Sequence, residues 1–208
     1  MEGYITSGNG RSEFTEKKSV FIGSIRCVTT EAEARAFIAE VSSEFSDATH
    51  NVFCYILREG NIIRFSDDGE PGGTAGKPAL EVLTREGVRD TCLVVTRYFG
   101  GIKLGAGGLV RAYAASAKKT LDAAGKCRMM PFLTAEALMG YSDWAPAEDL
   151  LKRLPCEVDG IEYGTDVSVR LLLPAEALGR VKDALADLTA GRALFEVTGE
   201  VLRGVKEG

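Results

Sequence analysis

Residues 97–113 read R-Y-F-G-G-I-K-L-G-A-G-G-L-V-R-A-Y and join a β-branched run to an alanine-rich amphipathic run. Glycines in this stretch permit positive φ angles and a close approach of the backbone to a ligand, which side chains resist. The helix expected from Leu109 to Gly125 would add its unpaired first-turn amides and its positive dipole end. We interpret the stretch as an anion-binding loop. Its candidate anion- or nucleic-acid-binding residues are Arg97, Tyr98, Gly100, Gly101, Lys103, Gly105, Gly107, Gly108, Arg111 and Tyr113.

The composition indicates one large or two small globular domains, because 208 residues with 45% hydrophobic content can bury a core. No apolar stretch approaches the roughly 20 residues that span a bilayer, and the start, M-E-G-Y-I-T, lacks signal-peptide features. We therefore expect a cytoplasmic protein with no membrane partner. The five cysteines are spread singly without a C-x-x-C pair, which predicts reduced structural thiols and no zinc knuckle. We expect no cofactor.

The net charge of −5 is unevenly distributed along the chain. Residues 1–131 hold 17 Lys and Arg against 16 Asp and Glu, whereas residues 132–208 hold 8 against 14. Between Arg97 and Arg128, seven basic residues are opposed by a single acidic residue, Asp122. A local positive field therefore survives the acidic total.

The first part of the chain alternates helical and β-rich patterns. Thr30 is a typical N-cap for an amphipathic helix over residues 31–45. The β-rich runs at 51–58 and 62–65 are separated by Glu59-Gly60-Asn61, which predicts a hairpin. The other elements expected here are a strand at 18–28, a loop at 66–76, a helix with Pro78 in its first turn that ends near Gly87, a buried strand at 91–98, and the glycine loop with its helix.

A complete second pattern begins after residues 127–131, so we place a domain boundary there and predict domains at 1–129 and 130–208. The second domain reads βαββαβ, the ferredoxin-like arrangement. Two helices are expected on one face of its antiparallel sheet, with the other face open. The predicted fold class is therefore α+β. The strands are expected at 132–139, 157–163, 165–173 and 193–202, and the helices at 145–154 and 175–188.

A second unusual segment, F-S-D-D-G-E-P-G-G-T-A-G-K-P at 65–78, carries three carboxylates within residues 67–70. Carboxylates this close repel one another unless a divalent cation or a basic side chain lies among them. The alternative is a solvated acidic turn, since Asp-Asp-Gly and Glu-Pro-Gly-Gly are good turn formers. We favour a joint site with the basic loop and assign no metal, although Asp67, Asp68 and Glu70 are possible ligands. The candidate residues of this cleft are Asp67, Asp68, Glu70, Thr74, Lys77 and His50.

The segment at 65–78, combined with V-V-T-R-Y-F-G-G-I-K-L-G-A-G-G-L-V-R-A-Y at 94–113, resembles the IMPACT/YigZ family. The similarity extends through K-S-V-F-I-G at 18–23 and H-N-V-F-C-Y at 50–55, and so covers most of residues 15–128. The βαββαβ tail resembles the C-terminal domain of bacterial-type members.

This resemblance has implications for fold and function. The first domain would be similar to domain 2 of a small-subunit ribosomal protein, a fold shared with domain IV of elongation factor G and with GHMP kinases. The tail would resemble domain V of the same factor. A role near translation is also implied, because eukaryotic relatives regulate the starvation response of an initiation-factor kinase. Gly72 stands where the family pattern has serine.

Our leading hypothesis is a non-catalytic, translation-linked regulatory protein that binds RNA, the ribosome or a translation factor through the basic glycine loop. Tyr98, Phe99 and Tyr113 could stack on unpaired bases, with about 1–3 kcal/mol per base. Core packing is the alternative role for each ring, and we favour it for Phe99.

Three other functions were compared with this one. An enzyme acting on a phosphorylated small molecule would hold a divalent metal on the three carboxylates, but the loop is not a P-loop. A prolyl dipeptidase lacks support, because His50 is the only histidine and H-E-x-x-H is absent. A purely protein-binding module would use the acidic second domain as its docking face.

Overall fold

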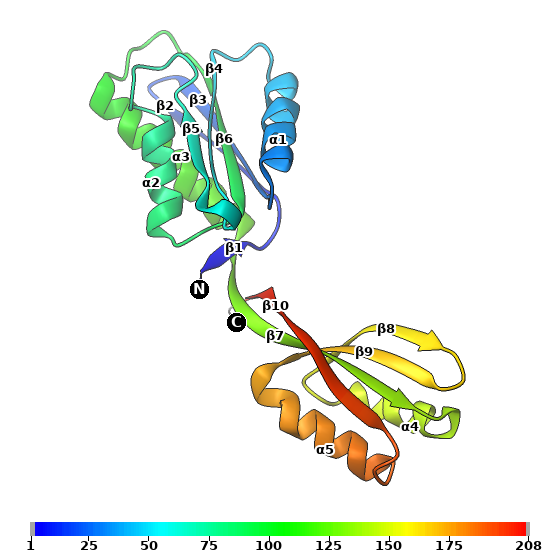
Figure 1. The fold of residues 1–208 in the computed structure, drawn as a ribbon. Helices are drawn as coiled ribbons and strands as arrows, with labels where there is room; N and C mark the ends of the chain where they lie inside the picture. The colour runs from blue at the N-terminus through cyan, green and yellow to red at the C-terminus, as the bar shows by residue number, and fades with distance from the viewer. Residues whose placement is uncertain (1–2, 207–208) are drawn as a thin grey trace. The chain divides into compact units, whose positions relative to one another are not determined.

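The computed structural model describes residues 3–206, which form two compact units (Figure 1). The first unit contains the chain up to Met129 and the residues from Gly204 onward, and the second is Met130–Arg203. No helix in the described part of the chain is long and apolar enough to cross a bilayer.

The first unit is built on a five-stranded antiparallel sheet in the order β2-β3-β6-β4-β5. A short strand, β1, pairs instead with the start of β7. The elements are β1 (Tyr4–Thr6), β2 (Gly10–Glu16), β3 (Ser19–Cys27), α1 (Glu31–Glu44), β4 (His50–Ile56), the 3-10 turn η1 (Glu59–Asn61), β5 (Ile63–Ser66), α2 (Gly76–Arg85), β6 (Thr91–Tyr98), α3 (Ala106–Ala124) and β7 (Lys126–Met139).

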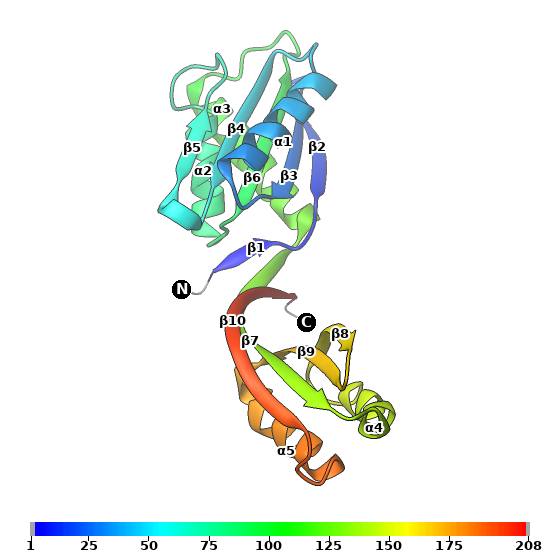
Figure 2. The ribbon, with the colours of Figure 1, turned by 45° about the vertical axis from the view of Figure 1, so that its right-hand side comes forward.

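Helices cover both faces of this sheet, with α1 on one face and α2 and α3 on the other (Figures 1 and 2). The central strand β6 shows the consequence, because its side chains alternate between two cores. Leu93 and Val95 pack toward α2 and α3, whereas Cys92 and Val94 pack toward α1. A strand buried on both faces must be apolar at nearly every position, which explains its continuous hydrophobic run.

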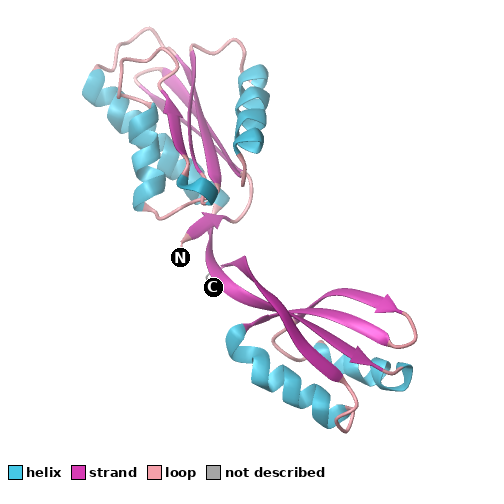
Figure 3. Cartoon of the chain, viewed as in Figure 1, coloured by secondary structure: helices cyan, strands magenta, loops and turns pink. Residues whose placement is uncertain are grey.

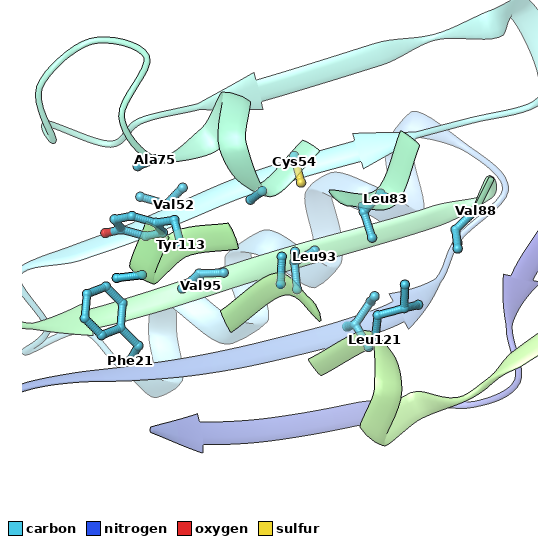
Figure 4. Close-up of a cluster of buried hydrophobic side chains, with 14 of the residues drawn as sticks. Phe21, Val52, Cys54, Ala75, Leu83, Val88, Leu93, Val95, Tyr113 and Leu121 are labelled. Atoms are coloured by element: carbon cyan, nitrogen blue, oxygen red, sulfur yellow. The ribbon is translucent and has the colours of Figure 1, made fainter. Parts of the chain in front are cut away.

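The larger core lies between the sheet and the helices α2 and α3 (Figure 4). Phe21 from β3 packs edge-on against Tyr113 from α3, with ring centroids 5.3 Å apart. Leu83 of α2 and Leu121 of α3 are fully buried in the same cluster. Burial of each such side chain stabilises the fold by about 1.5–3 kcal/mol.

The second unit is a four-stranded sheet in the order β10-β7-β9-β8, with α4 and α5 on one face (Figure 3). Val169 and Leu171 of β9 point into the core with Val181 of α5, and Arg170 between them points out of it. This order and alternation are those of a ferredoxin-like βαββαβ unit. Its further elements are α4 (Tyr141–Leu151), β8 (Glu157–Tyr163), β9 (Val167–Pro174), the 3-10 turn η2 (Ala175–Ala177), α5 (Leu178–Leu188) and β10 (Leu194–Lys206).

The predicted fold class is confirmed, and the differences are local. Strand β2 was not predicted, because G-R-S-E-F-T-E is an edge strand with mainly polar side chains. Helix α3 begins three residues earlier than Leu109, because the Leu109 amide already bonds to the Gly105 carbonyl at 2.9 Å. Strand β7 begins at Lys126 rather than 132, since its first residues pair with the unpredicted β1.

Candidate functional site

The glycine loop, residues 99–105, links the end of β6 to α3 and lies against the turn between β2 and β3. The Phe99 amide donates to Thr49 Oγ1 at 3.1 Å, and the Gly100 amide donates to Ser19 Oγ at 3.3 Å. A Cβ at Gly100 would collide with the carbonyl oxygen of Lys18. Glycine is required at position 100 by this close approach of two backbones.

Arg97 is a structural residue, which corrects its assignment to an open anion site. Its side chain is on the α2 and α3 face of the sheet and only 5% of the residue is exposed. Nη1 donates to Glu70 Oε1 at 2.6 Å, and Nη2 donates to Ser19 Oγ at 3.2 Å. Because Glu70 is also buried, the ion pair ties the acidic segment to the end of β6.

Tyr113 completes the same buried network. Its hydroxyl donates to Glu70 Oε1 at 2.8 Å, and the residue has no exposed surface. Burial, followed by the nearby Glu70 carboxylate, raises the pKa of Tyr113 far above its ordinary value. The side chain therefore cannot stack on a nucleic-acid base, which corrects that prediction.

The other two carboxylates of the acidic segment bind backbone amides. Asp67 accepts from the amides of Gly73, Ala75 and Gly76 at 2.7, 3.1 and 2.8 Å, and so caps the start of α2, which has no side-chain cap of its own. Asp68 Oδ2 accepts from the Asn51 amide at 2.6 Å. These bonds explain how three acidic residues fit within one turn.

The three carboxylates do not gather around a common point. Each accepts from its own donors, and among residues 3–206 no three His, Cys, Asp or Glu side chains are grouped to hold a metal ion. The suggestion of a metal at Asp67, Asp68 and Glu70 is therefore not supported. We expected either a divalent cation or a basic side chain to offset the charge of these carboxylates. The structure shows a basic side chain in this role, in the ion pair of Arg97 with Glu70.

His50 lies at the edge of this network. Its Nδ1 is 2.6 Å from the carbonyl oxygen of Asp68, which fixes Nδ1 as the donor in the neutral ring. Nε2 then lies 3.9 Å from Glu70 Oε1. The ring thus braces the acidic segment from the start of β4.

A pocket of about 310 Å³ opens between the two segments. Its apolar wall includes Phe99 and Leu109, and its polar groups include Lys103 and the ion pair of Arg97 with Glu70. Gly105 and Ala106 also line it, so the unpaired first-turn amides of α3 are beside the opening. Small apolar pockets with a few converging polar groups are typical ligand sites.

The remaining predicted residues divide between the loop and other places. Gly101 and Gly105 have φ angles of 82° and 73°, so both use the conformational freedom of glycine. Tyr98 points to the opposite face of the sheet, where its hydroxyl donates to Asp47 at 2.7 Å. Thr74 is buried and donates to the Pro71 carbonyl, and Lys77 lies away from the loop in a groove beside α2. Gly107 and Gly108 belong to the first turn of α3.

The surface of the loop is basic and partly apolar. Phe99 and Ile102 are 46% and 43% exposed, so the core role favoured for Phe99 is wrong. Lys103 and Arg111 are exposed beside them. The lysines of the β2–β3 turn were not predicted, although Lys17 shares a hollow with Arg111. We call this surface the basic loop face, defined by Lys17, Lys18, Phe99, Ile102, Lys103 and Arg111.

Lys17 and Lys18 hold an unusual backbone conformation. Glu16 pairs with Ser19, so the two lysines form a two-residue hairpin turn, with φ angles of 46° and 65°. Turns with two positive φ angles strongly prefer Asn-Gly, and the left-handed conformation costs other residues about 1–2 kcal/mol each. Strained residues of this kind cluster at functional sites.

Comparisons with known proteins agree with this architecture. The Impact N-terminal domain family matches residues 17–121, and a domain of unknown function, DUF1949, matches residues 139–192. IMPACT family member YvyE of Bacillus subtilis is 37% identical over 88% of this chain and 85% of its own. IMPACT family member YigZ of Escherichia coli is 35% identical over 84% of this chain and 87% of its own.

A crystal structure of a hypothetical protein shares 32% sequence identity and superposes with a TM-score of 0.63, covering 94% of this chain and 97% of that one. The resemblance found in the two glycine-rich segments is thereby confirmed, since both segments lie within the matched Impact N-terminal domain. The chain belongs to the IMPACT family.

Proposed function

We propose that this protein is a non-catalytic, translation-linked regulator that binds RNA, in particular RNA exposed on the ribosome, through the basic loop face. The link to translation rests on the implications of the family resemblance. A translation factor is the alternative partner, and it would occupy the same surface.

One observation carries the proposal. Two lysines occupy a strained tight turn that Asn-Gly would fill at lower energy, and the turn lies directly against the glycine loop. Their side chains are exposed, as are those of Lys103 and Arg111. Conformational strain that places cations at the surface is better explained by binding than by stability.

The neighbouring side chains suit single-stranded RNA. Phe99 and Ile102 are exposed apolar groups in the same loop as the exposed Lys103, and aromatic rings stack on unpaired bases of any sequence. The buried pair of Arg97 and Glu70 holds the end of β6 rigid, so the loop begins from a fixed point. Preorganised loops lose less conformational freedom on binding.

Ribosome co-sedimentation tests the proposal. The variant Lys103→Glu with Arg111→Glu changes two exposed side chains of the face and leaves the buried network intact. We expect wild-type protein to pellet with ribosomes at low salt and the variant to pellet at least tenfold less. Wild-type pelleting should weaken steeply as salt rises, because phosphate contacts release counterions.

A matched control carries the same charge change elsewhere. Arg153→Glu with Lys182→Glu replaces one exposed arginine and one exposed lysine of the second unit. This control should pellet like wild type. Equal loss in both variants would show that total charge, rather than the face, governs binding, and no pelleting at any salt would contradict the proposal. A phosphorylated small molecule in the 310 Å³ pocket would then become the leading alternative.

A further inference from the structure

The free edge of the first sheet lies beside a helix. Strand β5 is the last strand of this sheet, paired with β4 on one side, and α2 runs next to it (Figure 2). A groove of about 580 Å³ lies between Phe65 of this strand and α2. It is lined by Phe65, Lys77, Leu80, Glu81, Thr84 and Arg85.

The register shows which backbone groups of β5 face outward. The Leu57 amide donates to the Ile62 carbonyl at 2.9 Å, so these two residues form a hydrogen-bonded pair. Pairs alternate along an antiparallel ladder, which makes Ile63 and Phe65 non-hydrogen-bonded partners of β4. Their N–H and C=O groups therefore point to the free edge. The Ile63 carbonyl accepts from Arg64 Nη1 at 2.9 Å, whereas among the described residues the Phe65 amide and carbonyl have no hydrogen-bond partner.

The side chains beside this edge are apolar. Phe65 pairs with Cys54, which faces the core under α2, so Phe65 is on the same face as the helix. It is 46% exposed, and Ile63 on that face is 41% exposed. Leu80 of α2 forms the opposite wall. An open strand edge next to an apolar groove is the arrangement that binds extended peptides by strand addition.

The charged side chains around the edge indicate which kind of peptide would bind there. Lys77 lies at the start of α2 and has no ion-pair partner in residues 3–206, whereas Arg85 at the other end of the helix pairs with Glu81 at 3.5 Å. Arg64 is exposed between Ile63 and Phe65 on the opposite face of β5, where its Nε lies 3.9 Å from Glu31 Oε1 and its Nη1 donates to the Ile63 carbonyl at 2.9 Å. Glu81 is the one acidic residue in the groove, so the surroundings are net positive.

We propose that β5 and α2 form a docking site for an extended peptide of a partner protein, in which apolar residues alternate with acidic ones. The apolar side chains would enter the groove between Phe65 and Leu80. An acidic side chain opposite Arg64 would lie on its face, because directly opposed residues of paired strands share a face. This site uses different residues from the basic loop face and does not depend on the proposed function.

The probe is the peptide acetyl-Glu-Val-Glu-Val-Glu-Val-Glu-amide, titrated into the full chain and followed by amide NMR. We expect the largest shifts at Ile63 and Phe65, with slowed hydrogen exchange of both amides. The same peptide with lysine in place of glutamate should bind at least tenfold more weakly. Arg64→Glu should reduce this preference at least threefold, because the acidic side chains of the peptide would share its face.

Proline substitution tests the strand addition. Ile63→Pro removes an outward N–H and leaves the β4 ladder intact, so the fold should persist while peptide binding falls at least tenfold. Leu80→Glu, which leaves the backbone edge unchanged, should weaken binding as strongly by blocking the groove. Shifts confined to other residues, or equal binding of both peptides, would overturn the proposal. So would a concentration-dependent dimer that Ile63→Pro dissolves, because a second copy would then be the occupant.

Discussion

Replacing Arg97 by methionine would leave the Glu70 carboxylate buried without its cation. The two side chains are 6% and 3% exposed and their nearest charged atoms are 2.6 Å apart. Removing one partner of a buried ion pair costs about 3–5 kcal/mol, because the remaining charge keeps its desolvation penalty. The Tyr113 hydroxyl still donates to Glu70, so we expect a loss near the lower limit, about 3 kcal/mol.

The assay is hydrogen exchange of the β6 amides in the native state, which reports opening of the first unit. Fluorescence of the one tryptophan, Trp144, would report the second unit instead. The double variant Arg97→Met with Glu70→Gln removes both charges and keeps an acceptor for Tyr113. It should be at least about 1 kcal/mol more stable than Arg97→Met alone. A single-variant loss below about 1 kcal/mol, or a double variant no better than the single, would refute the reasoning.

Three further predictions follow from the same unit. Gly100→Ala should lower stability by about 1–3 kcal/mol because its Cβ would collide with Lys18, whereas Gly107→Ala, whose Cβ would meet only the Arg111 side chain at 3.6 Å, should raise it by about 0.5–1 kcal/mol. Thermal melts measure both changes, and equal effects of the two substitutions would contradict the prediction. Asp67→Ala should lower the free energy of unfolding by about 2 kcal/mol, because it removes the cap of α2. Urea unfolding measures this loss, and Asp122→Ala, at an exposed position, is the control. Because burial raises the pKa of Tyr113 in the folded protein, its contribution to the free energy of unfolding is present below about pH 10 and is lost above it, where the tyrosine of the unfolded chain ionises. Between pH 9 and pH 11, Tyr113→Phe should therefore lose less stability than the wild type.

Apart from β1 and β2, the elements of both units were predictable because they follow hydrophobic periodicity. The burial of Arg97 could also have been predicted from the sequence, since Arg97 continues the two-residue alternation of Leu93 and Val95 toward the same core. Tyr113 likewise continues the helical spacing of Leu109 and Ala117. In both cases the chemical type of the residue suggested a surface role that its position excludes.

The partners of the acidic segment could not be predicted from the sequence. Asp67 binds amides six to nine residues ahead, and Asp68 reaches the start of β4, so both depend on how the chain folds back. The β2–β3 turn was missed for a related reason. Lys17-Lys18 is not a typical turn pair, and only the pairing of Glu16 with Ser19 reveals the turn.

The most direct test of the basic loop face is the salt dependence of binding to single-stranded RNA. Four exposed cations predict a slope of log K against log salt of about −2.8. The variant Lys17→Asn with Lys18→Gly removes two of them while relieving the strained turn, so it should be more stable than wild type. We predict a slope of about −1.4 and weaker binding for this variant. An unchanged slope and affinity in the folded variant would contradict the account.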